Sequence, residues 1–351
     1  MDHLRYLLPA SFFTVTGLGV FYGGGAVWIG LALFPTVALI EYFLKDDLHA
    51  LKMSDFSGML ILYLQLIAPV FLWYSLWVFL GTDYTWLEWT GASLSTSLIT
   101  AAVGLPIAHE LFHKNGKIPR FLGNLLGVTL MAGDIEMEHK IGHHIETSSA
   151  LDVDTPYRGE NLYTFIPRLM IFFHTSPWKL EKKRFATKGK SHWSFANRIL
   201  WAWFGFALLV AFFAATDGWF AACTVVLISV VGQSIASIFS YVQHYGLIRL
   251  PNTPIEKRHA FNHIRPLSRP LTMEIVTHSE HHTDPTVPYW KLTPYEDVIR
   301  PGSAYGYFLL TLVPPLWHKR MREHLKEWDE KYASEDELKL AKEANIKAGW
   351  I

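Results

Sequence analysis

The sequence predicts an all-α integral membrane protein with six transmembrane helices and a histidine-rich region on the cytoplasmic side. Two observations support this fold class. Only 18% of the 351 residues are charged and 50% are hydrophobic, whereas soluble domains carry about 25% charged residues. The apolar residues also lie in long blocks, as expected for membrane spans. The charge is balanced, 31 basic against 31 acidic residues, which argues against a nucleic-acid-binding protein because such a protein needs a basic surface.

The spans follow from where the apolar blocks are interrupted. The first block is too long for one span of about 20 residues, and Gly23-Gly24-Gly25 divides it into a helical hairpin. The last block is divided in the same way by Thr216-Asp217-Gly218. Two uninterrupted blocks lie between them. We therefore expect six spans, over residues 6–22, 26–44, 59–80, 92–108, 199–215 and 219–241.

The loop charges predict the orientation of these spans. Loop 81–91 contains no Lys or Arg, whereas segment 109–198 and the chain after the sixth span are rich in both. Because Lys and Arg are enriched in cytoplasmic loops, both termini and the segments 109–198 and 242–351 are expected in the cytoplasm. All of 1–351 is expected to form a single membrane domain.

The cytoplasmic segments also contain apolar stretches. Residues 121–137, 163–173 and 305–317 are too short or too interrupted to be spans, and Pro314-Pro315 breaks the last of them. We expect them to form helices that pack on the cytoplasmic ends of the bundle or lie in the membrane interface. The tail 320–347 is rich in Glu, Lys and Ala, a composition typical of a solvated helix.

Histidine placement carries most of the functional information. In His109-Glu110-Leu111-Phe112-His113 the i, i+4 spacing puts two imidazoles on one helix face, which suits two ligands of one metal. The same spacing recurs in the second group, which adds an adjacent histidine. Nine of the 17 histidines fall into four such groups: His109 and His113; His139, His143 and His144; His244; and His278, His281 and His282.

These groups predict a metal centre without thiolate ligands. The single cysteine, Cys223, excludes an intrachain four-cysteine zinc site or iron–sulfur cluster. Imidazole suits iron, copper and zinc, and eight or nine imidazoles suit two metal ions. A non-haem diiron centre for O2 activation is the best interpretation. His259 and His263 are also spaced i, i+4, and we expect them to support the site or to lie on a helix surface.

Two other classes of metal-binding protein fit these histidine groups less well. His109 to His113 satisfies the H-E-x-x-H pattern of zinc hydrolases, but a zinc site needs only three protein ligands and would leave the second and fourth groups unused. A metal transporter would place its ligands inside the spans near the middle of the bilayer, whereas these groups are expected at the cytoplasmic ends.

The groups resemble the three histidine boxes and the H-Y-G motif of the membrane alkane omega-hydroxylase family. The matching residues are His109 to Lys114, Glu138 to His144, His244-Tyr245-Gly246 and His278 to His282. The flanks are more similar to the hydroxylase component of xylene monooxygenase, a branch that oxidises methyl groups on aromatic rings. They are residues 1–6, 152–159, 241–247, 274–278 and 344–350.

Some positions depart from one branch or the other. Glu138 and Gly142 resemble the alkane branch more than the xylene branch. Glu280 stands where the alkane pattern usually has Asp, and Phe112 replaces a small residue of the alkane first box. The resemblance therefore implies hydroxylation of a terminal or benzylic methyl group to a primary alcohol, and it leaves alkylbenzenes (xylene, toluene, cymene) and n-alkanes open as substrates.

The resemblance also implies the cofactors and the residues that hold them. Two iron ions would be bound by all nine clustered histidines, with O2 as co-substrate. Nearby carboxylates would fix the imidazole tautomers through the distal N–H; the candidates are Glu110, Glu138, Asp152, Asp154 and Glu280.

The expected partners follow from the same resemblance. They are a hydrophobic small molecule, the lipid bilayer of the bacterial inner membrane with the metal site on its cytoplasmic side, and an electron donor. The donor would be an NADH-dependent iron–sulfur reductase (xylene branch) or rubredoxin with its reductase (alkane branch). A membrane fatty-acyl desaturase or hydroxylase uses similar boxes and stays a further alternative, although the H-Y-G motif and Glu138 argue against it.

Overall fold

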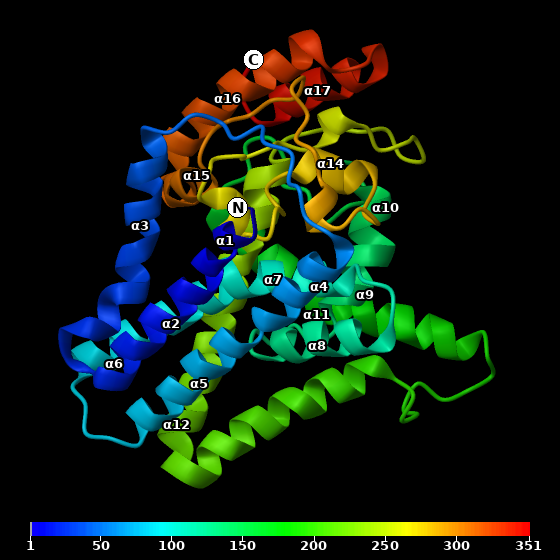
Figure 1. Cartoon of the computed structure of the whole chain (residues 1–351). Coiled ribbons are helices and arrows are strands. Elements are labelled where there is room, and N and C mark those ends of the chain that lie inside the picture. The colour runs from blue at the N-terminus through cyan, green and yellow to red at the C-terminus, as the bar shows by residue number, and fades with distance from the viewer. Residues whose placement is uncertain (1) are drawn as a thin grey trace.

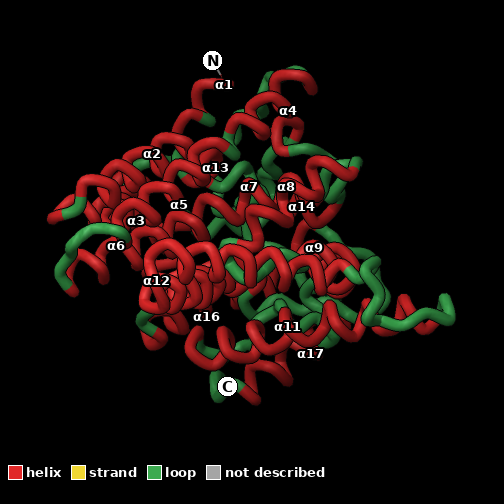
Figure 2. The backbone as a smooth tube through the Cα atoms, turned by 90° about the horizontal axis from the view of Figure 1, so that it is seen from below, coloured by secondary structure: helices red, strands yellow, loops and turns green. Residues whose placement is uncertain are grey.

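The computed structural model describes residues 2–351, and within them the chain is helical and contains no β-strand. Ser149 and Arg249 form an isolated parallel β-bridge. The predicted all-α fold class is confirmed. Seen from below (Figure 2), five helices gather on one side of the molecule, and the remaining helices and loops extend from them. The five are α2 (Leu7–Tyr22), α3 (Ile29–Tyr42), α5 (Ile67–Leu80), α6 (Trp86–Ile99) and α12 (Arg198–His244).

Five helical segments are long and apolar enough to cross a membrane. They cover Asp2–Tyr22, Gly24–Tyr42, Asp55–Leu80, Trp86–Phe112 and Arg198–His244. Their elements are α1 (Asp2–Arg5), α2 (Leu7–Tyr22), η1 (Gly24–Trp28), α3 (Ile29–Tyr42), α4 (Asp55–Leu64), α5 (Ile67–Leu80), α6 (Trp86–Ile99), the π-helical η2 (Thr100–Gly104), α7 (Leu105–Phe112) and α12 (Arg198–His244).

The predicted interruptions lie where the backbone leaves helical geometry. Gly23 follows α2 with a φ of 72°. Gly218 lies inside α12 with a φ of 83° and a ψ of −179°, a conformation open to glycine but not to residues with a Cβ. The 47-residue α12 is therefore broken at the predicted turn. Five segments meet the criteria for a span, and a count of six crossings remains a prediction.

The other segments form further helices, most of them at the top and right of the view in Figure 1. They are α8 (Lys117–Val128), α9 (Ile135–Glu138), the π-helical η3 (His139–His143), α10 (His144–Glu146), α11 (Leu162–Ala186), η4 (Lys257–His259), α13 (Ser268–Leu271), α14 (His278–Thr283), η5 (Tyr289–Lys291), α15 (Ala304–Thr311), α16 (Pro314–Lys331) and α17 (Glu335–Lys347). The predicted break at Pro314-Pro315 separates α15 from α16.

The tail differs from the single solvated helix expected over 320–347. Ser334 accepts a hydrogen bond from the Glu337 backbone and starts a new helix, α17. The preceding α16 buries Trp317, Met321 and Leu325, which follow one another at spacings of four residues and form one helix face. Composition alone hid this apolar face, because charged residues surround it.

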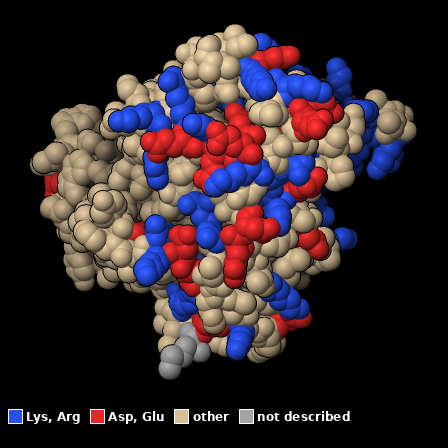
Figure 3. All heavy atoms as spheres, turned by 90° about the horizontal axis from the view of Figure 1, so that it is seen from above, with Lys and Arg blue, Asp and Glu red and all other residues tan. Residues whose placement is uncertain are grey.

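Charge is concentrated on the face that carries α14, α16 and α17. Figure 3 shows this face from above, with Lys and Arg side chains interspersed with Asp and Glu. In contrast, the helices below it expose many large apolar side chains, among them Leu39, Val70, Trp86 and Phe212. Exposed apolar side chains in such numbers are typical of helices that contact lipid.

Candidate dinuclear metal centre

All nine clustered histidines come together in the folded chain. They form two adjacent groups, and within each group the candidate ligand atoms all lie within 4.8 Å of one another. The two groups touch, because the rings of His144 and His282 have centroids 4.7 Å apart. One group contains His109, His113, His139, His144 and His281, and the other contains His143, His244, His278 and His282.

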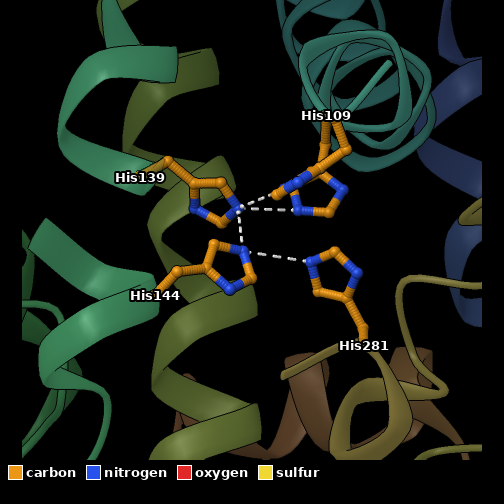
Figure 4. Close-up of side chains that lie close together, drawn as sticks. His109, His139, His144 and His281 are labelled. Carbon is orange, nitrogen blue, oxygen red and sulfur yellow. Dashed lines mark hydrogen bonds between the residues drawn. The ribbon is translucent and has the colours of Figure 1, made fainter. Parts of the chain in front are cut away.

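The ring nitrogens converge in a way that hydrogen bonding cannot explain. In the five-histidine group, Nε2 of His139 lies 2.8 Å from Nε2 of His109, and Nε2 of His144 lies 3.1 Å from Nε2 of His281 (Figure 4). A neutral imidazole has one N–H to donate, so several Nε2 atoms facing one another cannot all be paired. Two imidazoles bound to one ion at about 2.1 Å per bond bring their nitrogens to about this separation. The donor set therefore fits a metal ion.

The second group converges in the same manner. Nε2 of His278 lies 2.8 Å from Nε2 of His244 and 3.0 Å from Nε2 of His282. The ring of His143 completes the group, with its centroid 4.9 Å from that of His244. All four histidines are buried. Two neighbouring sets of imidazoles thus offer binding places for two ions.

The second histidine box divides its ligands between the two groups. The i, i+4 spacing predicted that His139 and His143 share one face of an α-helix. The structure instead has a π-helical turn over His139–His143, and π-helical turns recur at functional sites. The wider turn brings His139 and His144, five residues apart, into one group and sends His143 to the other. The first box behaves as predicted, with both of its histidines in one group.

The four-histidine group has a complete set of acceptors for its Nδ1 atoms. Nδ1 of His143 lies 3.0 Å from Oδ2 of Asp152, and Nδ1 of His282 lies 3.1 Å from Oγ1 of Thr147. Backbone carbonyls serve the other two, those of His259 for His244 and Ile275 for His278. An Nδ1–H donated in this way leaves the Nε2 lone pair facing the centre.

Burial controls the charge of these rings. It lowers the pKa of His139 and His144 well below the usual value, and the neighbouring imidazoles lower it further. The neutral form, which binds metals, is therefore favoured. His143 differs, because burial lowers its pKa but the carboxylates of Asp152 and Asp154 outweigh this effect and raise it to about 9.

The predicted carboxylates do not all reach a histidine. Asp152 does, and Oδ2 of Asp154 lies 3.6 Å from Nδ1 of His143. Glu110 instead accepts from the Tyr289 backbone at 3.0 Å and pairs with Lys114.

Glu138 and Glu280 also have other partners. Glu280 accepts from Asn262 at 2.8 Å, and Glu138 accepts from Ser176. A Cβ at position 142 would lie 1.8 Å from Oε1 of Glu138. Gly142 is therefore the residue that makes room for the Glu138 carboxylate within the second box.

The H-Y-G motif anchors the loop that carries the aspartates. Gly246 donates its backbone N–H to Pro156 at 3.0 Å and accepts from Arg158 at 2.8 Å. The Tyr245 hydroxyl accepts from the Gly159 backbone at 3.1 Å. Gly246 has a φ of 67°, and a Cβ there would lie 2.7 Å from Leu325. The motif thus fixes segment 152–159 beside His143.

Sequence reasoning missed several residues that orient the site. Asn262 accepts from the backbone N–H groups of His278 and Ser279, both at 2.8 Å, and so fixes the start of α14. Thr147 supports His282. No spacing signal marks either residue, because single Asn and Thr side chains are common in loops. His259 contributes its backbone carbonyl, whereas its ring pairs with Glu337 at 2.8 Å.

A partly enclosed cavity adjoins both histidine groups. It has a volume of about 60 Å³ and is lined by His109, His139, His143 and His278 together with residues of α7, α12 and segment 130–135. Its apolar walls include Leu105, Phe112, Leu130 and Phe239. Apolar walls of this kind offer a place for an apolar group beside the histidines.

Comparison with known proteins agrees with this arrangement. Residues 84–314 match the family described as "Fatty acid desaturase". The chain is 35% identical to the xylene/toluene monooxygenase hydroxylase component of Pseudomonas putida, over 100% of this chain and 96% of that protein. It is 26% identical to alkane 1-monooxygenase 2 of Alcanivorax borkumensis (85% and 82% covered) and to an alkane 1-monooxygenase of Pseudomonas putida (96% and 85% covered). The chain therefore belongs to the fatty acid desaturase family and, within it, to the membrane monooxygenases that hydroxylate hydrocarbons.

Proposed function

We propose that this protein hydroxylates the benzylic methyl group of an alkylbenzene such as xylene, toluene or cymene, giving a primary alcohol. The observation that carries the proposal is the pair of adjacent histidine groups lining a partly apolar cavity. The relative with 35% identity over the whole chain is named for xylene and toluene, which supports an aromatic substrate.

The residues that would bind the cofactor follow from the two groups. The five-histidine group would hold one iron ion and the four-histidine group a second, because neutral imidazoles without thiolates suit this metal. Two bound irons would supply the activation of O2, so that one oxygen atom enters the C–H bond and the other leaves as water after uptake of two electrons and two protons. The chain's own share is to orient the ligand imidazoles, to hold the methyl group beside them and to exclude water.

The electrons would come from a separate protein on the cytoplasmic side of the bacterial inner membrane. An NADH-dependent iron–sulfur reductase or rubredoxin with its reductase would serve as donor. The charged face that carries α14, α16 and α17 (Figure 3) supports an orientation with the metal centre toward the cytoplasm.

A second candidate is omega-hydroxylation of n-alkanes. The cavity volume of about 60 Å³ is smaller than the roughly 150 Å³ of an engineered cavity that binds benzene. An aromatic ring would therefore have to displace lining side chains such as Leu130 or Phe239, whereas an unbranched chain requires less room. The alkane 1-monooxygenase relatives support this candidate as well.

Product analysis separates the candidates. Cells that express the chain with an electron donor are given p-xylene or octane, and the products are identified by mass spectrometry. We expect 4-methylbenzyl alcohol from p-xylene, and 1-octanol as the main product would favour the alkane candidate. An alkene from an acyl chain, with no alcohol from either hydrocarbon, would show that the protein is a desaturase and contradict the proposal.

A further inference from the structure

The wall of the cavity that α12 contributes is polar. Gln233, Ser237, Ser240 and Gln243 line the cavity and recur at spacings of four, three and three residues, so they lie along one face of the helix. The same cavity is otherwise lined largely by apolar residues and by the histidines. Polar side chains within a membrane helix are costly and usually mark a functional site.

Hydrogen bonding accounts for some of these side chains. Ser237 donates its hydroxyl to the backbone carbonyl of Gln233 at 3.0 Å. Gln243 donates its amide to the carbonyl of Ile275 at 3.0 Å, which is the carbonyl that also orients His278. These two residues therefore contribute to the helix and to the metal site.

Gln233 is different. Its Oε1 lies 3.1 Å from Nε2 of His174 on α11, so His174 donates to it and fixes the orientation of the amide. Its Nε2 has no acceptor in the described part of the chain, and the residue is only 3% exposed. A buried N–H group without an acceptor is rare, because leaving it unpaired costs much of a hydrogen bond. Gln233 lines the cavity, so an acceptor atom of a bound molecule would satisfy this donor.

The position of the donor indicates which part of a ligand it would meet. Gln233 precedes His244 by eleven residues of α12, which corresponds to about 16 Å along the helix axis. His244 belongs to the metal site, so the Gln233 amide lies toward the opposite end of the cavity. A substrate whose methyl group is beside the histidines would present its far end to Gln233.

We propose that Gln233 selects substrates that carry an acceptor oxygen, such as an ether or carbonyl oxygen, at the end remote from the reacting methyl group. This inference rests on the proposed function and refines its substrate class: a methyl-substituted arene with one oxygen opposite the methyl, favoured over alkylbenzenes without the oxygen. The Nε2–H group donates to that oxygen and holds the methyl toward the histidines. An analogue with a CH2 group in place of the oxygen leaves the donor unpaired.

A competition experiment tests the inference. Cells that express the full chain with an electron donor receive equal amounts of 4-methylanisole and 4-ethyltoluene, which differ by O against CH2 at one position. The ratio of 4-methoxybenzyl alcohol to 4-ethylbenzyl alcohol gives the ratio of the two kcat/KM values, independent of expression and electron supply. We expect Gln233→Leu to lower this ratio about tenfold, as expected for the loss of one buried hydrogen bond.

Two further variants complete the design. Gln233→Glu has nearly the same shape but replaces the donor by an acceptor, so it should lower the ratio as well. Ser234→Ala is the matched control, because the Ser234 hydroxyl bonds to the Val230 carbonyl and to Met170 and does not line the cavity. It should leave the ratio at the wild-type value.

Other outcomes overturn the inference in distinguishable ways. An unchanged ratio in Gln233→Leu would show that the amide does not meet the substrate. An unchanged ratio combined with altered oxidation of the alcohol product would show that it binds the new hydroxyl group instead. If the wild type oxidises p-xylene but not 4-methylanisole, the substrate class is wrong. Failure to oxidise any of these arenes or octane would contradict the proposed function itself.

Discussion

Asp152 provides the sharpest test of how the four-histidine group is held. Its Oδ2 accepts from His143 at 3.0 Å and from the Thr155 hydroxyl at 2.6 Å, and its Oδ1 accepts from the Asp154 backbone at 3.0 Å. Asp152→Asn replaces one of these oxygens by an NH2 group. Whichever oxygen is replaced, a donor then faces a donor, so either His143 or the loop loses its partner.

The expected magnitude follows from the role of such partners. Removing a carboxylate that orients a ligand histidine typically lowers metal affinity by about 10–100-fold, or about 1.4–2.7 kcal/mol. The purified protein is exposed to a chelator for increasing times, and the iron that remains per chain is measured by mass spectrometry. We expect Asp152→Asn to lose iron at least about tenfold faster than the wild type.

A charge-matched control excludes a general electrostatic effect. Glu146 ends α10, six residues before Asp152, and its carboxylate accepts from Ser149 at 3.0 Å rather than from a histidine. Glu146→Gln should retain iron as the wild type does. Equal iron retention by Asp152→Asn and the wild type would refute the assigned role of Asp152, provided that both proteins have the same helix content by circular dichroism.

Two further predictions concern the ligands and the packing around them. His143→Ala or His281→Ala should each abolish hydroxylation and at least halve the iron per chain, because each removes an imidazole from a different group. Full turnover with unchanged iron would contradict the assignment. Substitution of the exposed His49 serves as the control. Gly58→Ala should destabilise the protein by about 1–3 kcal/mol, because its Cβ would lie 2.2 Å from the Trp290 ring. Thermal unfolding in detergent measures this loss of stability. Gly25→Ala serves as the control, because no atom lies within 4 Å of a Cβ at that position. Equal unfolding midpoints for Gly58→Ala and the wild type would show that Trp290 moves freely.

The grouping of the histidines was predictable from the sequence because spacing on a helix restricts which rings share a face. All nine predicted residues lie in the two groups. How the histidines divide between the two groups was not predictable. The division depends on the π-helical turn over His139–His143, and no residue type is characteristic of such a turn. The H-E-x-x-H and H-x-x-H-H patterns thus indicate the kind of site but not the geometry around each ion.

The supporting residues were harder to predict for a different reason. Long carboxylate side chains reach several donors, and the nearest donor depends on tertiary packing. Glu110 therefore contacts Tyr289, which is 179 residues away, and Glu280 contacts Asn262. Likewise, the polar wall of the cavity was hidden within the last apolar block of the sequence, because Gln and Ser interrupt such a block only weakly. Packing revealed which helix face meets the histidines.

The division of single histidine boxes between two groups has a consequence for assembly. His143 and His144 are neighbours in the chain yet belong to different groups, and the same is true of His281 and His282. A backbone movement that accompanies binding of the first ion therefore also moves the ligand residues of the second ion. Iron binding at the two sites should be cooperative, so that partly reconstituted samples consist mainly of chains with no iron and chains with two irons.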